Sequence, residues 1–400
     1  MKKRFIINTI ITSVILFLIF GVYGRSIFGV NESREMKKVG FVYESDESTP
    51  YTYNFIRAQK ALEDAYPGQV TVFTESNISE AHAEEAIDRL IAEGCDIIFT
   101  TSYGYQFPAK EKAFEHPEIQ FCQATGDNSF TEPVPDNYHT FMGEIYQGRY
   151  LTGLVAGMKL KSLIDDGSLS PDEAKLGYVA AYQLPEVVSG YTAFYLGVKE
   201  VVPSARMMVK YTDSWSNFVA EKKAAQELIK KGAVIIGQHC DTIGPAMACE
   251  EYEGSHPVYH VGYNQSAIDV APTTSLVSTR INWIPYVIGA TTAVLEKKDI
   301  EKSMKGCHIH GNDCGAGFSK DWVQLLDLNK YIVAPGTEEL LKEKEKQLAG
   351  ERLKVFYGDY HGVNPEDPSD VIDLKKGFIE NANRSAPEFY YILDDIEFIK

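Results

Sequence analysis

Aromatic and amide side chains gather in the stretch PYTYN (50–54), which follows the short apolar run at 39–43. Tyr51 and Tyr53 supply rings, and Asn54 supplies an amide that can both donate and accept hydrogen bonds. Ser102 follows a later apolar run and adds a hydroxyl group. A flat ligand needs rings for stacking and a few polar groups that read its edge. These residues therefore predict one half of a ligand-binding site.

The second half of the chain carries a comparable set of groups. Glu186 lies in the stretch LPEV, and Trp215 lies in DSWSN, just before a predicted helix. His239 and Asp241 stand where another apolar run ends. Any one aromatic ring, taken alone, is equally typical of core packing. Because such groups recur at successive strand ends, we interpret them as ligand-binding residues.

Motifs for covalent or metal-assisted catalysis are missing from the sequence. There is no G-x-S-x-G elbow, no H-E-x-x-H helix, no phosphate-binding G-x-x-x-x-G-K loop and no C-x-x-C pair. The nine histidines are scattered, and none stands in a context that marks a catalytic base. We therefore predict a binding protein with no catalytic residues and no cofactor.

The six cysteines are too sparse for a disulfide scaffold in a chain of this length. Most of them are expected to be small buried hydrophobic residues. Cys307 and Cys314 bracket the stretch HIHGND, so an oxidising compartment would favour a loop disulfide there. His308 and His310 in the same stretch are candidate metal ligands, but their spacing fits no standard zinc site. We predict no metal site.

Short apolar runs alternate with amphipathic helices from residue 38 onward. The predicted strands are 39–43, 70–74, 96–102, 119–124, 175–181, 205–211, 233–239 and 257–263. Predicted helices include 79–94, with Ser79 as its cap and Gly94 as its stop, and 217–231. Buried strands separated by amphipathic helices indicate an α/β fold, with parallel sheets covered by helices on both faces.

One stretch of the first half recurs in the second half. Residues 86–98 and 224–236 align without gaps, and each reads as a helix, a glycine stop and a buried strand. Ligands of open parallel sheets bind beyond the carboxyl ends of the strands. Two doubly wound sheets facing each other would form a cleft lined from both sides. That arrangement is typical of a hinged binding protein whose lobes close around a ligand.

The charge balance excludes one class of partner. The 400 residues include 39 basic and 56 acidic side chains, which leaves a formal net charge of −17. Such a surface does not suit a role that depends on neutralising phosphates. We therefore predict that no nucleic-acid polymer is a partner.

The N-terminus combines a basic tip with an apolar run. Nineteen uncharged residues, 5–23, follow the sequence MKKR. This pattern predicts either a cleaved secretory signal or an uncleaved membrane anchor, and both place the acidic body outside the cytoplasm. No cysteine precedes Cys95, so we do not expect a lipid anchor behind the signal.

Taken in order, several segments make the chain similar to a known family. The shared landmarks are YTYNFIRAQKALE, GRYLTGLVAG, KLGYVAAYQLPEV, YTDSWSN, LIKKGAVIIGQHCD, VGYNQSAIDVAP and STRINWIPY. From residue 38 to about residue 330, the sequence resembles the basic membrane protein (BMP) family of substrate-binding proteins for ABC transporters. The resemblance implies a type I periplasmic-binding-protein-like fold and a purine nucleoside or purine base as the ligand.

The resemblance also implies roles for single residues. The family's Ser-Phe-Asn, whose ring stacks on the base, looks like Thr52-Tyr53-Asn54, so Tyr53 and Trp215 would sandwich a purine. The Asp-Gln that binds the ribose or base edge falls on Asn264-Gln265, and a basic residue falls on or near Arg280. Asparagine in place of aspartate at Asn264 loses a charge and adds a donor, which weakens ribose binding or changes the preferred ligand.

The resulting prediction is an extracytoplasmic capture protein that presents its ligand to an ABC permease and is held at the membrane by its N-terminal segment. The alternatives are a membrane-anchored sensor with the same module, and an extracytoplasmic nucleoside hydrolase that would use His239 or Asp241. The predicted parts are 1–36 (signal or anchor and linker), 37–145 (lobe 1), 146–262 (lobe 2), 263–335 (return to lobe 1 and hinge) and 336–400 (C-terminal extension). The extension is expected to be a charged helix at 336–350, an acidic loop at 359–370 and a strand within 386–399, packed on one lobe.

Overall fold

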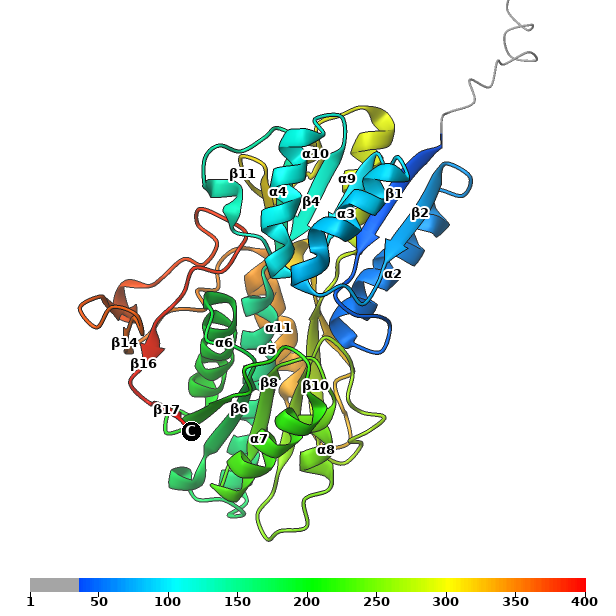
Figure 1. The fold of residues 1–400 in the computed structure, drawn as a ribbon. Helices are drawn as coiled ribbons and strands as arrows, with labels where there is room; N and C mark the ends of the chain where they lie inside the picture. The colour runs from blue at the N-terminus through cyan, green and yellow to red at the C-terminus, as the bar shows by residue number, and fades with distance from the viewer. Residues whose placement is uncertain (1–35) are drawn as a thin grey trace, which may run out of the picture.

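The computed structural model describes residues 36–400, which form two lobes stacked one above the other (Figure 1). Each lobe is built on a seven-stranded sheet with helices on both faces. This confirms the predicted α/β fold with two doubly wound sheets. The predicted signal peptide or membrane anchor lies outside the described residues. Within residues 36–400, no helix combines the length and apolar character needed to cross a membrane.

Lobe 1 has the strand order β11-β12-β5-β4-β3-β1-β2, and its neighbouring strands are parallel except β11 and β12. Its strands are β1 (Lys37–Val42), β2 (Val70–Glu75), β3 (Ile97–Thr100), β4 (Gln120–Ala124), β5 (Tyr138–Gly143), β11 (His308–His310) and β12 (Asp313–Ala316). Its helices are α2 (Pro50–Ala65), α3 (Ala83–Ala92), α4 (Gln106–Glu115), α9 (Ile284–Glu296) and α10 (Ile300–Ser303). Alternate strand residues face opposite sides, so Phe99 packs with α2 and α9 while Ile98 packs with α3 and α4.

Lobe 2 has the strand order β13-β10-β9-β8-β6-β7-β17, in which only β10 and β13 pair antiparallel. Its strands are β6 (Lys175–Ala180), β7 (Arg206–Tyr211), β8 (Ile235–His239), β9 (Tyr259–Tyr263), β10 (Ser275–Ile281), β13 (Val323–Leu326) and β17 (Ile396–Phe398). Its helices are α5 (Ile145–Asp165), α6 (Pro185–Val201), α7 (Phe218–Lys230) and α8 (Gly244–Glu250). Helices α5 and α6 share one core with the sheet, and α7 and α8 cover the other face.

The apolar runs locate their strands to within two residues of the observed ends. Gly94 and Gly232 both adopt positive φ, at 78° and 90°, as expected of glycines that stop helices. Ser79 occupies the N-cap position of the turn that leads into α3, but its side chain makes no capping hydrogen bond. Ser79 is followed by a 3₁₀ turn, its hydroxyl contacts His82, and α3 begins only at Ala83. The short 3₁₀ helices are η1 (Glu80–His82), η2 (Tyr103–Tyr105), η3 (Asn128–Phe130), η4 (Pro171–Glu173), η5 (Phe318–Lys320) and η6 (Leu374–Lys376).

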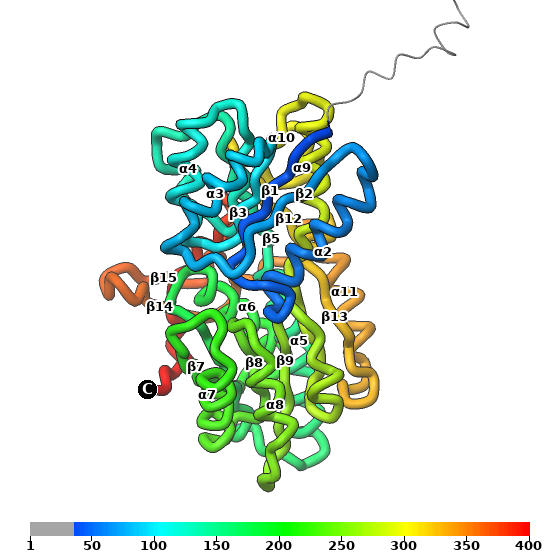
Figure 2. The backbone as a smooth tube through the Cα atoms, turned by 45° about the vertical axis from the view of Figure 1, so that its right-hand side comes forward, coloured from blue at the N-terminus to red at the C-terminus, as the bar shows by residue number. Residues whose placement is uncertain are grey.

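The chain passes between the lobes three times, at 143–145, 281–284 and 316–323 (Figure 2). The segment 263–335, predicted as a return to lobe 1 and hinge, is therefore divided. Strands β10 and β13 belong to the sheet of lobe 2, whereas the chain from α9 to β12 lies in lobe 1. Trp283 stands at the second crossing, where it is buried and stacks on Phe55 with ring centroids 4.4 Å apart.

The C-terminal region begins with α11 (Thr337–Ala349), which packs on α5 as a charged helix. A small antiparallel sheet follows, made of β14 (His361–Val363), β15 (Val371–Asp373) and β16 (Ile392–Leu393). The single strand predicted within 386–399 is two short strands, β16 and β17, separated by Asp394 and Asp395. Strand β17 extends the sheet of lobe 2 beside β7.

Candidate functional site

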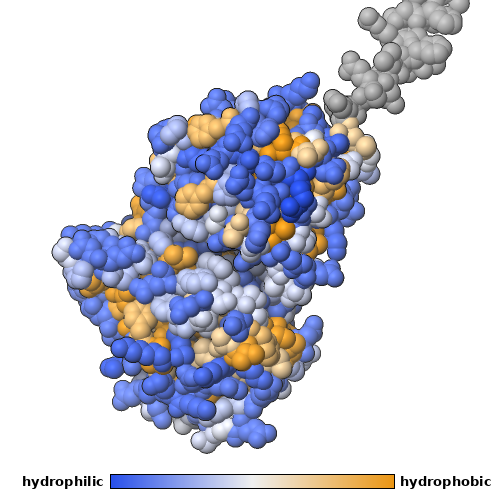
Figure 3. Space-filling view, in the orientation of Figure 1, coloured by the Kyte–Doolittle hydropathy of each residue, from blue (hydrophilic) through white to orange (hydrophobic). Residues whose placement is uncertain are grey.

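A cavity lies between the lobes and encloses about 410 Å³ of space free of protein atoms, part of which is open to solvent. Its walls come from the carboxyl ends of the strands and the segments that follow them, where open parallel sheets bind ligands. Lobe 1 contributes Glu44, Tyr51, Ser102, Tyr103 and Thr125, and lobe 2 contributes Glu186, Trp215, His239, Asp241 and Tyr263. The molecular face in Figure 3 is largely hydrophilic, with separate apolar patches on each lobe.

Aromatic rings from both lobes line the cavity. Trp215 stands edge-on to Tyr182, with ring centroids 5.2 Å apart. On the opposite lobe, the hydroxyl of Tyr51 donates to the carbonyl of Thr101 over 2.5 Å. The ring of Tyr51 packs edge-on against Phe55, with centroids 5.4 Å apart. These contacts hold both rings in fixed orientations before any ligand arrives.

Three carboxylates, Glu44, Glu186 and Asp241, face the same cavity. Burial raises the pKa of Asp241 to about 8. Burial, and secondly the neighbouring Glu80, also raises the pKa of Glu44. Among the described residues that line this cavity there is no lysine or arginine. The walls are thus rich in hydrogen-bond acceptors, which suits a ligand that carries several N–H or O–H donors.

His239 is buried at the floor of the cavity, with its Nε2 3.5 Å from a Glu186 carboxylate oxygen. Burial, and secondly the nearby positive charge of Arg149, lowers the pKa of His239 to about 4. The imidazole is therefore neutral at pH 7. With Nε2–H donating to Glu186, the buried and unpartnered Nδ1 is an acceptor.

Arg149 lies behind this floor and is itself buried. Its Nη1 donates to the carbonyl of Gln238 over 2.6 Å, and its guanidinium lies 3.7 Å from the ring centroid of Tyr263. This cation–π contact fixes the ring of Tyr263, which also lines the cavity.

Asn54 and Asn264 connect the two lobes next to the cavity. The side-chain amide of Asn54 donates to the backbone carbonyl of Asn264 over 2.9 Å. The side chain of Asn264 donates in turn to Asp241 over 3.2 Å. Asn264 adopts a left-handed backbone conformation, with φ of 62°, for which asparagine is one of the better-suited residues. Both asparagines orient groups of the cavity from behind its wall.

The structure thus brings six predicted residues to the cavity wall: Tyr51, Ser102, Glu186, Trp215, His239 and Asp241. It leaves Tyr53 outside, with 43% of its surface exposed. Residues two apart on a helix point about 200° away from each other, so Tyr51 and Tyr53 of α2 cannot face the same cavity. Arg280 also lies outside the wall, where it donates to Gln324 over 2.9 and 2.7 Å.

The sequence interpretation missed four wall residues, namely Glu44, Tyr103, Thr125 and Tyr263. Each of them ends a strand or follows one closely. The signal that marks all four in the sequence is a polar or aromatic side chain within a few positions of a strand end.

The stretch around Cys307 contains two free thiols in contact with each other, those of Cys307 and Cys314. All six cysteines are free thiols, so the structure does not contain the loop disulfide between Cys307 and Cys314. His308 forms an ion pair with the buried carboxylate of Glu144 over 2.5 Å. That carboxylate raises the pKa of His308 to about 9. His308 is therefore one partner of an ion pair with Glu144, which lies at the first crossing between the lobes.

A sequence model described as "ABC transporter substrate-binding protein PnrA-like" (Bmp) matches residues 37–352. The chain belongs to the Bmp family. This Bmp protein is 32% identical over 277 residues to a purine-binding protein of Brucella abortus, covering 69% of this chain and 73% of that relative. It is 25% identical over 331 residues to a putative ABC transporter glucose-binding protein of Haloferax volcanii, covering 83% and 76%.

Solved structures share the fold of this Bmp protein. An ABC transporter solute-binding protein of Aeropyrum pernix superposes with a TM-score of 0.63 at 17% identity, covering 83% of this chain and 95% of that one. A further solute-binding protein, from Conexibacter woesei, gives a TM-score of 0.59 at 20% identity, covering 79% and 97%. The family match makes the Bmp protein a substrate-binding protein of the ABC transporter class, with a small molecule as its ligand.

Proposed function

We propose that this Bmp protein captures a purine nucleoside or purine base in the interlobe cavity, outside the cytoplasm, and delivers it to an ABC permease. One observation carries the proposal: rings from both lobes and three carboxylates converge on a cavity at the carboxyl ends of the two sheets. The name of the Brucella abortus relative, a purine-binding protein, supports the same ligand class.

In this proposal the flat base lies between Tyr51 of lobe 1 and Trp215 of lobe 2. Each stacking contact contributes about 0.5–1.5 kcal/mol beyond the burial of apolar area. Glu44, Glu186 and Asp241 accept hydrogen bonds from the N–H groups of the base and the hydroxyls of the ribose. Tyr51 thus takes the stacking role that the family resemblance assigns to Tyr53.

Transport also requires that the protein reach the outer side of the cell membrane and bind an ABC permease there. We propose that the N-terminal segment, as a signal or an anchor, directs the protein to the outer side of the cell membrane. Closure of the two lobes around the ligand would then bring both lobes into the arrangement that the permease recognises. The ligand leaves intact, which separates this role from that of a nucleoside hydrolase.

Tryptophan fluorescence tests the ligand class directly. Trp283 and Trp322 are buried in the core, so Trp215 is the tryptophan whose surroundings change when the cavity fills. We expect adenosine, guanosine or inosine to change the emission saturably, and glucose to leave it unchanged at the same concentrations. The variant Trp215→Phe is the control, because it should abolish the signal. A saturable response to glucose alone would contradict the purine assignment.

Binding should release a proton, because the raised pKa of Asp241, about 8, leaves this carboxyl mostly protonated at pH 7. Ligand donors bond best to the ionised carboxylate and so lower its pKa. Affinity therefore rises from pH 6 to pH 8, by at most about tenfold per pH unit, and levels off above pH 8. His239, with a pKa of about 4, does not titrate in this window.

Calorimetric titration in buffers of different ionisation enthalpy measures the released proton. The variant Asp241→Asn should bind with an affinity that changes much less between pH 6 and pH 8. The account of Asp241 fails if the wild-type affinity is the same throughout that window.

A further inference from the structure

The C-terminal residues 353–400 lie beyond the Bmp match, which ends at residue 352. In Figure 1 this segment leaves lobe 2, rises along one side of the molecule toward β11 of lobe 1, and returns to lobe 2 at β17. Both of its ends are therefore fixed on the same lobe, while its middle reaches the other lobe.

The contact with lobe 2 is extensive and apolar. Phe356 and Phe389 are buried and stack with centroids 4.5 Å apart, within the core that α5 and α6 share with the sheet. Strand β17 pairs with β7 along three residues. The buried carboxylate of Glu380 accepts a hydrogen bond from Ser189 of α6 over 2.7 Å. This half of the segment is an integral part of lobe 2.

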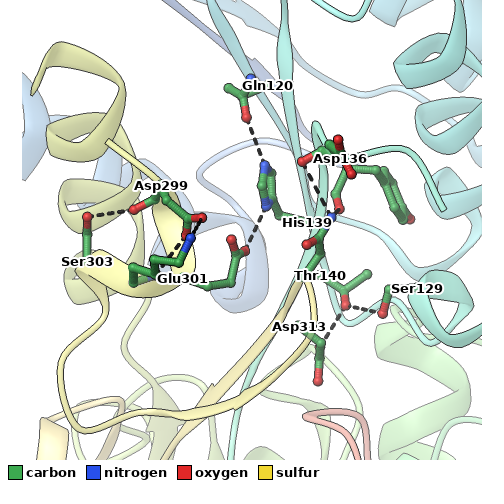
Figure 4. A network of polar contacts seen from close by, with 12 residues as sticks. Gln120, Ser129, Asp136, His139, Thr140, Asp299, Glu301, Ser303 and Asp313 are labelled. Atoms are coloured by element: carbon green, nitrogen blue, oxygen red, sulfur yellow. Dashed lines mark hydrogen bonds and ion pairs between the residues drawn. The ribbon is translucent and has the colours of Figure 1, made fainter. Parts of the chain in front are cut away.

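The contact with lobe 1 is smaller and polar. Ser385 donates its backbone N–H and its hydroxyl to the carboxylate of Asp313, over 2.5 and 2.6 Å. Asp313 lies in β12, is fully buried, and also accepts from Thr140 of β5 over 2.7 Å. Figure 4 shows Asp313 beside Thr140, which contacts Ser129 in turn. The guanidinium of Arg384 lies 5.3 Å from the ring centroid of Phe130 in lobe 1.

We propose that residues 353–400 form a strap that ties lobe 1 to lobe 2 and restrains the opening of the cleft. Rotation of the lobes about the three crossings would move Asp313 away from Ser385, since the strap is built into lobe 2. Opening would then leave the buried carboxylate of Asp313 without two of its three donors. Breaking two hydrogen bonds to a carboxylate costs free energy, so the strap favours the closed arrangement of the lobes.

The strap therefore lowers the fraction of ligand-free molecules whose lobes are open, compared with a protein in which only the three crossings join the lobes. A site that is already assembled loses less affinity to conformational reorganisation. The inference rests on hinged lobes, as in the proposed function, but it does not depend on which ligand the cavity takes.

Two variants weaken the contact from opposite sides. The double variant Arg384→Ala with Ser385→Ala removes the two strap side chains that contact lobe 1 and keeps the hydrogen bond from the backbone N–H of Ser385. Asp313→Asn acts from lobe 1, because the amide is uncharged and has one acceptor oxygen where the carboxylate has two, which weakens the hydrogen bonds from Ser385. Lys375→Ala is the matched control, since Lys375 is an exposed residue of the same segment that pairs with Asp359, also in the strap. Thermal melting followed by circular dichroism establishes that each variant is folded.

The readouts are acrylamide quenching of Trp215 and small-angle X-ray scattering, both on the ligand-free protein. In both strap variants we expect the Stern–Volmer constant to rise about twofold as the open population grows, together with a larger radius of gyration. Lys375→Ala should match the wild type. Wild-type quenching and wild-type scattering in every folded strap variant would overturn the strap. Neither readout involves a purine, so a failed ligand assignment would leave this test unaffected.

Discussion

Replacing Trp215 with alanine should lower the affinity for a purine nucleoside at least about tenfold, which corresponds to about 1.4 kcal/mol. Trp215 lines the cavity from lobe 2 and is held edge-on to Tyr182. The variant loses a stacking contact of about 0.5–1.5 kcal/mol and also the burial of apolar ring surface. Both losses act on binding, and because Trp215 is partly buried against the core of lobe 2, the variant is first checked for folding by thermal melting.

The matched control is Tyr53→Ala. Tyr53 is an aromatic residue of α2 that the family resemblance assigns to stacking, but it lies outside the cavity and is 43% exposed. We expect its removal to change affinity less than about twofold, which is under 0.5 kcal/mol. Calorimetric titration of both variants decides the matter. Unchanged binding by Trp215→Ala, or an equal loss with Tyr53→Ala, would contradict the proposed sandwich.

Replacing Trp283 with alanine should lower the free energy of unfolding by about 3–5 kcal/mol, the range for truncating a large buried aromatic residue. Trp283 is almost completely buried where the chain crosses from lobe 2 to lobe 1. It stacks on Phe55 at 4.4 Å and packs edge-on against Phe141 at 5.5 Å and Tyr51 at 6.4 Å between centroids. The variant would leave a void at this position, and the packed aromatic rings around it have little freedom to move in and fill it.

Urea unfolding measures this loss, and Tyr331→Ala is the control because the side chain of Tyr331 is 98% exposed. Loss of Trp283 also removes a support of Tyr51, so ligand affinity should fall along with stability. A loss below about 1 kcal/mol would mean that the crossing tolerates repacking and that Trp283 does not hold the lobes' junction.

The architecture was largely predictable because buried parallel strands leave a clear pattern of short apolar runs. The same reasoning failed for α5, which the sequence interpretation did not assign as a helix. Fourteen of its 21 residues are buried, and they lie on every side of the helix, between the sheet, α6 and α11. A helix buried all round has no polar face, and so it lacks the amphipathic period on which the prediction relied.

The cavity was predictable in position but only partly in composition. Strand ends located Trp215 and Asp241 correctly at the cavity wall, since topology alone brings those ends together. The face of α2 that points inward depends on how the helix is rotated against its neighbours, and the motif alone favoured Tyr53 over Tyr51. The hydrogen bond between Ser385 and Asp313 joins residues that are 72 positions apart in the chain, and no local sequence pattern predicts such a contact.

Native mass spectrometry of the purified protein, without its N-terminal segment, tests the central claim most directly. The account predicts a retained small molecule, or one taken up in a one-to-one complex on addition, with the mass of a purine nucleoside or purine base. Dissociation in the gas phase should return that molecule intact. A retained sugar or amino acid, together with no complex on addition of purine nucleosides, would contradict the account.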